Sequence, residues 1–168
     1  MKAEIYPLEK IVIDGNTIYL NMERTHVEAL IGKGRAIGTR IYYLNNEIAI
    51  DYNGDKVDFI EFLSGIDGSI RPVIYGVSVF DTAADALLEI LKKQNGTDVD
   101  DSEAGYSYRF RNISVGIYRE AVPEEIEEMV KEAGEFGNPM SEDEIRYEMK
   151  RADHWASIGV GIAEYYRR

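Results

Sequence analysis

The chain has 168 residues, of which 45% are hydrophobic and 30% are charged, a composition typical of a globular domain. It contains no cysteine, which excludes a disulfide framework, thiolate metal sites and a cysteine nucleophile, and favours a reducing compartment. A formal net charge of −12 argues against binding to nucleic acid or anionic lipid, because phosphate contacts require clusters of Lys and Arg.

The N-terminal sequence MKAEIYPLEKIVIDGN contains no uninterrupted apolar segment. Glu4, Pro7 and Glu9 divide it, so neither the core of a signal peptide nor a membrane span can be placed there. No later stretch is apolar enough to cross a membrane. We therefore expect a cytoplasmic location and no membrane partner.

A short helix followed by a three-stranded antiparallel meander is predicted between residues 17 and 64. Thr25 and Glu28 have the spacing of a capping box, which predicts that the helix begins at Thr25. The alternating strands that follow are separated by Asn45-Asn46 and by Asn53-Gly54-Asp55, which are typical of tight hairpin turns. This segment therefore forms the first structural unit.

The same order of elements recurs between residues 75 and 166. Thr82 has the place of a second helix cap, and Asn95-Gly96 has the place of the helix end. Two strands then flank Arg111-Asn112, but the third strand, ASIGVGIAEYY, follows only at residues 156–166. The similarity in order predicts a tandem repeat whose second copy carries an insertion.

An acidic helical pair forms that insertion, at residues 121–153. Pro123 suits the first turn of a helix, and Ser141 and Glu144 form a capping box that starts a second helix. We predict one α+β domain over residues 1–168, built from two tandem helix-plus-antiparallel-meander units with the helical pair before the last strand. The meanders form either one continuous antiparallel sheet or two sheets side by side, with helices over one face.

Motifs for catalysis or for a cofactor are not found in the sequence. The only histidines, His26 and His154, lack partners at metal-binding spacing. The acidic loop at residues 98–103 lacks the Gly and Glu positions of an EF-hand, although weak binding of a divalent cation stays open. The segment Gly32–Gly38 has neither the dinucleotide-binding glycine spacing nor the P-loop ending. We therefore expect a non-enzymatic protein with no cofactor and no metal.

Tyrosines are concentrated on the predicted strands, where their bulk suits a half-covered sheet face. These are Tyr42, Tyr43, Tyr52, Tyr106, Tyr108, Tyr118, Tyr165 and Tyr166. Packing in the core and across strands explains them, whereas tyrosines on an open face would form a contact surface.

The stretch LNMERTHVEALIGKG resembles the start of repeats in the BamE-like lipoprotein and β-lactamase-inhibitor-protein group. The matching residues are Met22, Val27, Leu30 and Gly32. The resemblance covers roughly residues 20–63 and implies a helix that leads into an antiparallel sheet. The chain has Asn21 and Gly34 where that group favours Gly and Pro, and it lacks the lipobox cysteine, the export signal and the disulfides. The resemblance therefore implies a scaffold and not β-lactamase inhibition.

In general layout the chain also resembles small acidic bacterial immunity proteins, which neutralise polymorphic toxins. The leading interpretation is a protein-binding module, most specifically a toxin-neutralising immunity protein whose acids cover a basic site on its partner. The expected contact residues are Glu124, Glu125, Glu127, Glu128, Glu132, His154 and Trp155. For each glutamate, a merely solvated helix face is the competing interpretation.

Two other classes of function stay open. One is a small-ligand-binding or metabolic enzyme domain with its pocket between the two units. The other is a structural or scaffold role. The sequence leaves the identity of the partner and the oligomeric state undetermined.

Overall fold

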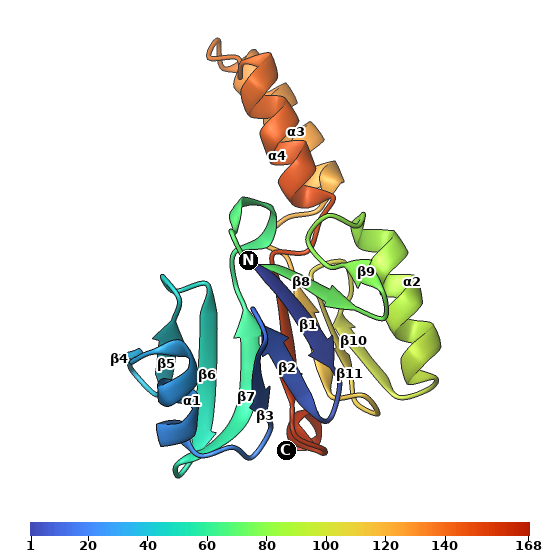
Figure 1. Ribbon diagram of the computed structural model, residues 1–168. Helices are drawn as coiled ribbons and strands as arrows, with labels where there is room; N and C mark the ends of the chain where they lie inside the picture. The colour runs from blue at the N-terminus through green and yellow to red at the C-terminus, as the bar shows by residue number, and fades with distance from the viewer.

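The two meanders join into one continuous antiparallel sheet of eight strands in the computed structural model, which describes residues 1–168 (Figure 1). The first meander consists of β4 (Arg35–Ile37), β5 (Arg40–Tyr43), β6 (Ile48–Asn53) and β7 (Lys56–Phe62). The second consists of β10 (Val99–Glu103), β11 (Ser107–Phe110), β12 (Val115–Tyr118) and β13 (Ser157–Gly161). β7 pairs with β13 at the centre, so the first of the two predicted sheet arrangements is confirmed, with one extra strand per meander.

Short polar residues and glycine close the predicted hairpins. Asn45 and Asn46 have φ angles of 57° and 66°, and Gly54 has a φ of 62°. Asparagine and glycine tolerate this left-handed region better than other residues do. The local sequence therefore fixes where β5, β6 and β7 turn.

A second sheet of five strands has the order β3-β2-β1-β8-β9, and the sequence analysis did not predict it. Its strands are β1 (Lys2–Tyr6), β2 (Lys10–Ile13), β3 (Asn16–Tyr19), β8 (Arg71–Ile74) and β9 (Val77–Ser78). The central strand β1 pairs antiparallel with β2 and parallel with β8. A parallel pair needs a long crossover connection, and here the whole first meander lies within that connection.

The small sheet gives each unit a leading hairpin. The order β2, β3, α1 (Arg24–Ile31) and four meander strands has its counterpart in β8, β9, α2 (Ala84–Asn95) and four meander strands. β1 lies between the two hairpins, and the seam between β7 and β13 lies between the two meanders. The α+β fold therefore contains two helix-plus-meander units with one order of elements.

The hydrophobic core lies between the two sheets. The small sheet covers one face of the large sheet, with α1 on one side and α2 on the other (Figure 1). A single cluster of 28 buried residues combines both sheets and both helices, for example Ile11 from β2, Ile60 from β7 and Leu87 from α2. Each such side chain contributes about 1.5–3 kcal/mol on burial, so this cluster is the main source of stability.

Both predicted threonine caps are wrong. α1 begins at Arg24, one residue before Thr25, and Glu28 forms an ion pair with Arg24 at 2.9 Å. Thr82 donates its hydroxyl hydrogen to the carbonyl of Ser78 at 2.6 Å and lies outside α2. Contacts with other elements fix these helix starts instead. At the start of α1, for example, the N–H of Arg24 donates to the Asp55 carbonyl at 2.8 Å. The helix ends at Gly32 and Gly96 are confirmed, with φ angles of 88° and 75°.

The predicted insertion is a helical hairpin that projects from the body (Figure 1). It consists of α3 (Pro123–Glu135) and α4 (Glu142–Ala152), and residues 123–152 are called the arm below. Pro123 occupies the first position of α3, and the Ser141–Glu144 capping box is present at the start of α4. No helix in the molecule combines the length and apolar character needed to cross a membrane.

Candidate protein-binding site

The arm holds its two helices together through one apolar face. Ile126 is buried, and Val130 and Ala133 are half-buried, at positions that share one side of α3. On α4, Ile145 and Met149 are half-buried at the matching helical spacing, and α3 and α4 are in contact. The opposite side of α3 is therefore free to face solvent or a partner.

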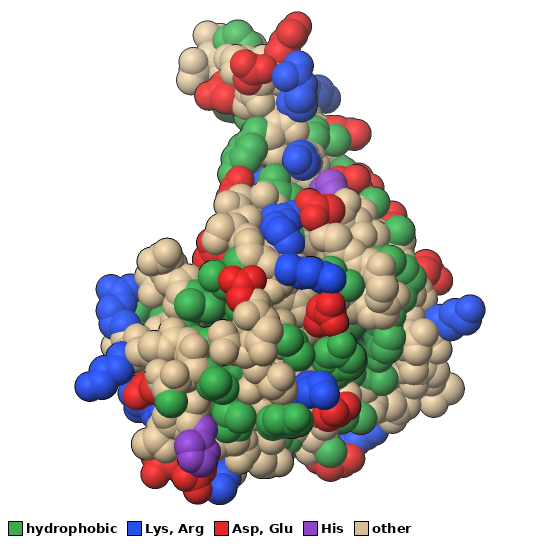
Figure 2. All heavy atoms as spheres, in the orientation of Figure 1, with side chains coloured by type: hydrophobic (Ala, Val, Ile, Leu, Met, Phe, Trp, Pro, Cys, Tyr) green, Lys and Arg blue, Asp and Glu red, His purple; other side chains and the backbone are tan.

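Half of the net negative charge of the protein lies on the arm. Residues 123–152 contain ten acidic and four basic side chains, a net charge of −6 within a formal total of −12. The arm stands clear of the body in the space-filling view (Figure 2). Charge on a projecting element extends the negative potential of the protein farther into solvent than charge on the body does.

None of the five predicted glutamates makes an ion pair in the structure, and four of them also lack a side-chain hydrogen bond. The ion pairs of the arm are Arg146–Asp143 at 3.0 Å, Arg151–Glu148 at 3.5 Å and Arg151–Glu120 at 3.3 Å, and none involves α3. The exposed and unpaired carboxylates on α3 include Glu124, Glu127, Glu128 and Glu132. Their charges are therefore not neutralised within the molecule.

The fifth glutamate, Glu125, has a structural role instead of the expected partner contact. Its carboxylate accepts hydrogen bonds from the Tyr106 hydroxyl at 2.5 Å and from the Val122 N–H at 3.1 Å. The Tyr106 hydroxyl, followed by the Val122 N–H, holds the pKa of Glu125 below its ordinary value. Glu125 therefore caps α3 and ties it to the loop before β11.

Trp155 is a core residue, so its expected role as a surface contact is wrong. Only 1% of Trp155 is exposed, and its indole N–H donates to Ala84 O at 2.9 Å. Its ring packs edge-on against Tyr108 at a centroid distance of 5.8 Å. His154 is half-buried at the end of α4, with Nδ1 2.7 Å from Lys150 O. Both residues position the root of the arm.

The root of the arm is held by further contacts to the body. Arg119 is 7% exposed and donates to Gly105 O and to Ala152 O, both at 2.7 Å. Its guanidinium lies 4.9 Å from the Trp155 ring centroid, a favourable cation–π geometry. Along α4, the Tyr147 hydroxyl donates to Asp67 at 2.6 Å. These contacts fix the direction in which the arm projects.

The tip of the arm carries an aromatic side chain that the sequence analysis did not single out. Phe136 is 85% exposed, the largest value among the big hydrophobic residues of the chain. It directly precedes Gly137, which has a φ of 74° and turns the chain toward α4. The sequence did contain a signal for this exposure, because Phe136 stands between Gly134 and Gly137 at the end of a helix. An aromatic residue there has no following helical turn against which to pack.

The face of the large sheet opposite the small sheet carries a concavity at the seam between the two units. Its floor lacks side chains at Gly116 and Gly159, and the Tyr166 ring lies over Gly116. Glu61 lines it and accepts a hydrogen bond from the Ser157 hydroxyl at 2.9 Å. The concavity has a volume of about 150 Å³.

Tyr165 and Tyr166 were predicted on a strand, and this is wrong. They lie in a short 3-10 helix, η2 (Tyr165–Arg167), that folds back over the large sheet. The Tyr165 ring stacks on Phe59 at a centroid distance of 4.5 Å. Gly116 of β12 and Gly161 of β13 leave the space that the Tyr166 and Tyr165 rings fill. Tertiary packing therefore decides the position of the two tyrosines.

The acidic segment at residues 98–103 was predicted as a loop, but residues 99–103 form the edge strand β10. Asp98 pairs with Arg111 at 3.0 Å, and Asp100 pairs with Arg109 at 3.1 Å. No group of three or more His, Asp or Glu side chains is arranged to hold a metal ion. These acids therefore hold the second meander together.

No protein-family model matches the chain, and comparisons with curated proteins and with solved structures found no match either. The resemblance to the BamE-like and β-lactamase-inhibitor-protein group therefore stays a prediction. Evidence about function comes from the geometry and charge of the arm.

Proposed function

We propose that this protein is a non-enzymatic module that binds another protein through the arm. In the manner of a bacterial immunity protein, it neutralises a toxin by covering a basic site on it. The observation that carries this proposal is the set of unpaired carboxylates on the exposed side of α3. These are Glu124, Glu127, Glu128 and Glu132.

Repulsion between these neighbouring carboxylates destabilises α3, and positive charges on a partner would offset that repulsion. Glu124, Glu128 and Glu132 follow one another at intervals of four residues, so they are neighbours on the helix surface. Like charges at this spacing destabilise a helix by about 0.2–0.5 kcal/mol per pair. Lys and Arg side chains on a partner would remove this repulsion and would also accelerate association.

The anchored root also favours binding. Arg119, the Tyr106–Glu125 hydrogen bond and the Tyr147–Asp67 hydrogen bond fix the arm before a partner arrives. A contact surface that is already ordered loses less conformational entropy when it binds. The arm therefore has the rigidity expected of an element that blocks a site.

The test compares charge reversal on the arm with the same charge change on the body. The arm variant carries Glu124→Lys, Glu128→Lys and Glu132→Lys, and the control carries Glu89→Lys, Asp101→Lys and Glu103→Lys at exposed positions. Each full-length protein is used to capture partners from a nuclease-treated extract of the native host. We expect the natural sequence and the control to retain one basic protein at equal stoichiometry, and the arm variant to lose it.

Equal capture by the arm variant and the control would refute the proposal. Raising the salt concentration supplies a second readout, because the association rate of the natural sequence should fall steeply with salt. The arm variant should lose most of that salt dependence. A rate that does not respond to salt would contradict an electrostatic contact.

The concavity at the β7–β13 seam favours a second candidate function, the binding of a small polar ligand between the two units. Glu61, Ser157 and Tyr166 converge on it above a floor of glycines. Its volume of about 150 Å³ is below the roughly 300–1,000 Å³ of typical ligand sites. A thermal-shift screen of small polar metabolites, repeated on Ser157→Ala, tests it: a stabilising compound should lose part of its effect when this polar group of the lining is removed.

A further inference from the structure

The charge density of α3 is close to that of a single nucleic-acid strand. α3 has 13 residues, which at a rise of 1.5 Å per residue gives a length of about 20 Å. α3 contains six acidic residues and one lysine, so its net charge of −5 corresponds to one negative charge per roughly 4 Å. One nucleic-acid strand carries one charge per about 3.4 Å, whereas a duplex carries one per about 1.7 Å.

The aromatic ring at the tip completes this likeness. Proteins that bind single strands combine a basic groove along the backbone with surfaces on which bases stack. Phe136 follows the charged face of α3 directly and is 85% exposed. It offers a flat ring where a base would lie.

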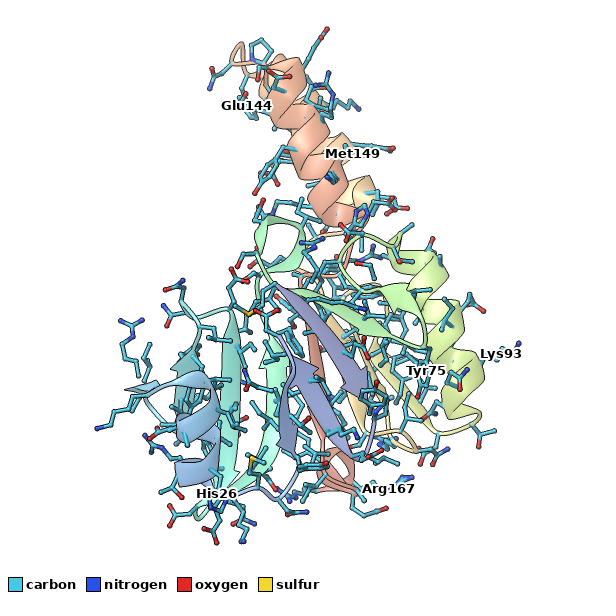
Figure 3. All side chains as sticks on the ribbon, viewed as in Figure 1. His26, Tyr75, Lys93, Glu144, Met149 and Arg167 are labelled. Carbon is cyan, nitrogen blue, oxygen red and sulfur yellow. The ribbon has the colours of Figure 1, made fainter.

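The backbone that carries Phe136 is held in place, although the side chain is exposed. Its N–H bonds to Glu132 O at 2.9 Å, and the Asn138 N–H bonds to Ala133 O at 3.0 Å. On the other side of the turn, the Ser141–Glu144 capping box starts α4, with Glu144 near the tip (Figure 3). The ring is therefore presented by a closed turn and not by a frayed helix end, which lowers the entropic cost of burying it.

We infer that the arm occupies a groove that holds single-stranded nucleic acid on its partner, with the α3 carboxylates in place of phosphates and Phe136 in place of a base. This inference rests on the proposed function and names the chemistry of the partner. Binding of the protein and binding of a single strand are then mutually exclusive. An aromatic anchor at the end of a charged stripe also explains why the most exposed hydrophobic residue lies at the tip.

The experiment uses the partner captured above, purified, and the full chain labelled for fluorescence anisotropy. The competitor is a 15-nucleotide oligothymidylate, compared with a 15-base-pair duplex and with polyglutamate of equal total charge. We expect the single strand to displace the arm at a lower concentration than either of the other two. Phe136→Ala should weaken the complex by about 5- to 150-fold, since stacking on one base has this value.

Matched variants separate stacking from general apolar contact. Phe136→Trp should bind as tightly as the natural sequence, whereas Phe136→Leu should bind as weakly as the alanine variant. Tyr118→Ala removes another exposed aromatic residue, 45% exposed on β12, and should leave affinity unchanged. All four variants should keep the same thermal unfolding midpoint to within a few degrees, because neither side chain belongs to the core.

Simultaneous binding of the oligothymidylate and the protein, or a loss of less than twofold for Phe136→Ala, would overturn the inference. If the arm charge reversal still abolishes capture in that case, the proposed function stands and only the single-strand chemistry fails. If the natural sequence retains no partner at all, the proposed function and the inference fail together.

Discussion

The connection between β6 and β7 and the connection between β12 and β13 occupy the same place in the two units, yet they differ completely. The first is a tight turn at Gly54 and Asp55, and the second spans residues 119–156 and contains the arm. In both units the two strands that the connection joins pair with each other antiparallel. A meander that ends in solvent tolerates such an insertion, because the entropic cost of a loop rises only slowly with its length.

The comparison also separates two sources of stability. The core cluster of 28 residues contains no residue between 123 and 152. The body should therefore unfold as one cooperative unit, while the arm opens locally around its own contacts. The predictions below test this separation, from the largest expected effect to the smallest.

Trp155→Ala should cause the largest change, because this residue joins the root of the arm to the core. Truncating a large buried aromatic side chain costs about 3–5 kcal/mol, and here the Ala84 carbonyl also loses its hydrogen bond. Urea unfolding at pH 7 measures the loss, with Trp155→Phe as the control that keeps a ring and costs less. A loss below about 1 kcal/mol would mean that the root does not belong to the core.

Glu47→Gln should weaken the contact between the β5–β6 turn and the segment just before β8, and the size of the effect should depend on pH. Burial alone would raise the pKa of Glu47, but hydrogen bonds from the Ser69 N–H, the Ile70 N–H and the Ser69 hydroxyl outweigh it and lower the pKa. The stabilisation is therefore present above the unfolded-state pKa of about 4.3 and is lost as the pH falls through the lower folded-state value.

At pH 7 we expect Glu47→Gln to reduce the free energy of unfolding by about 1–2 kcal/mol. The difference from the natural sequence should shrink as the pH falls from 7 through the lowered folded-state pKa of Glu47, and unfolding at pH 7 and in the acid range measures it. A difference of the same size at both pH values would show that packing, and not the charge, is responsible.

Ser141→Ala should affect only the arm. The Ser141 hydroxyl accepts a hydrogen bond from the Glu144 N–H at 3.2 Å, and loss of such a cap costs about 1 kcal/mol. Hydrogen exchange of the α4 amides should accelerate by about fivefold, while the amides of β7 and β13 keep their rates. Equal acceleration in the body would contradict the separation of arm and body.

Glu128→Gln should produce the smallest effect, and in the opposite direction. Glu128 lies four residues from both Glu124 and Glu132, so its removal relieves two like-charge pairs. It should stabilise the helix by about 0.4–1 kcal/mol at low salt, and salt should abolish the gain. Glu89→Gln on α2 is the control, because Glu89 has Lys92 within 3.4 Å and should gain nothing. Thermal unfolding of the arm by circular dichroism, with and without salt, compares the two.

Local signals in the sequence predicted much of the large sheet and the arm. Asn45-Asn46 and Gly54 mark turns by their own conformational preferences, and Pro123 and Ser141 mark helix starts by backbone geometry that involves only a few neighbours. The small sheet could not be predicted in this way, because β1 pairs with a strand that follows some 65 residues later in the chain.

Part of the candidate site could be predicted, and part could not. The acidic face of α3 follows from helical spacing, so Glu124, Glu128 and Glu132 were found. The roles of Glu125 and Trp155 depend on Tyr106 and Ala84, which are distant in the sequence. Phe136 was missed because helical periodicity describes the sides of a helix and not its end.

The sequence by itself determined six of the eight meander strands and the arm, and it placed half of the net negative charge on 30 consecutive residues. Only the tertiary structure decided which of those charges remain unpaired, which aromatic residues are buried and where the arm points. The physical reason is that turn and helix preferences act over a few residues, whereas burial and ion pairing depend on partners that only the folded chain brings together.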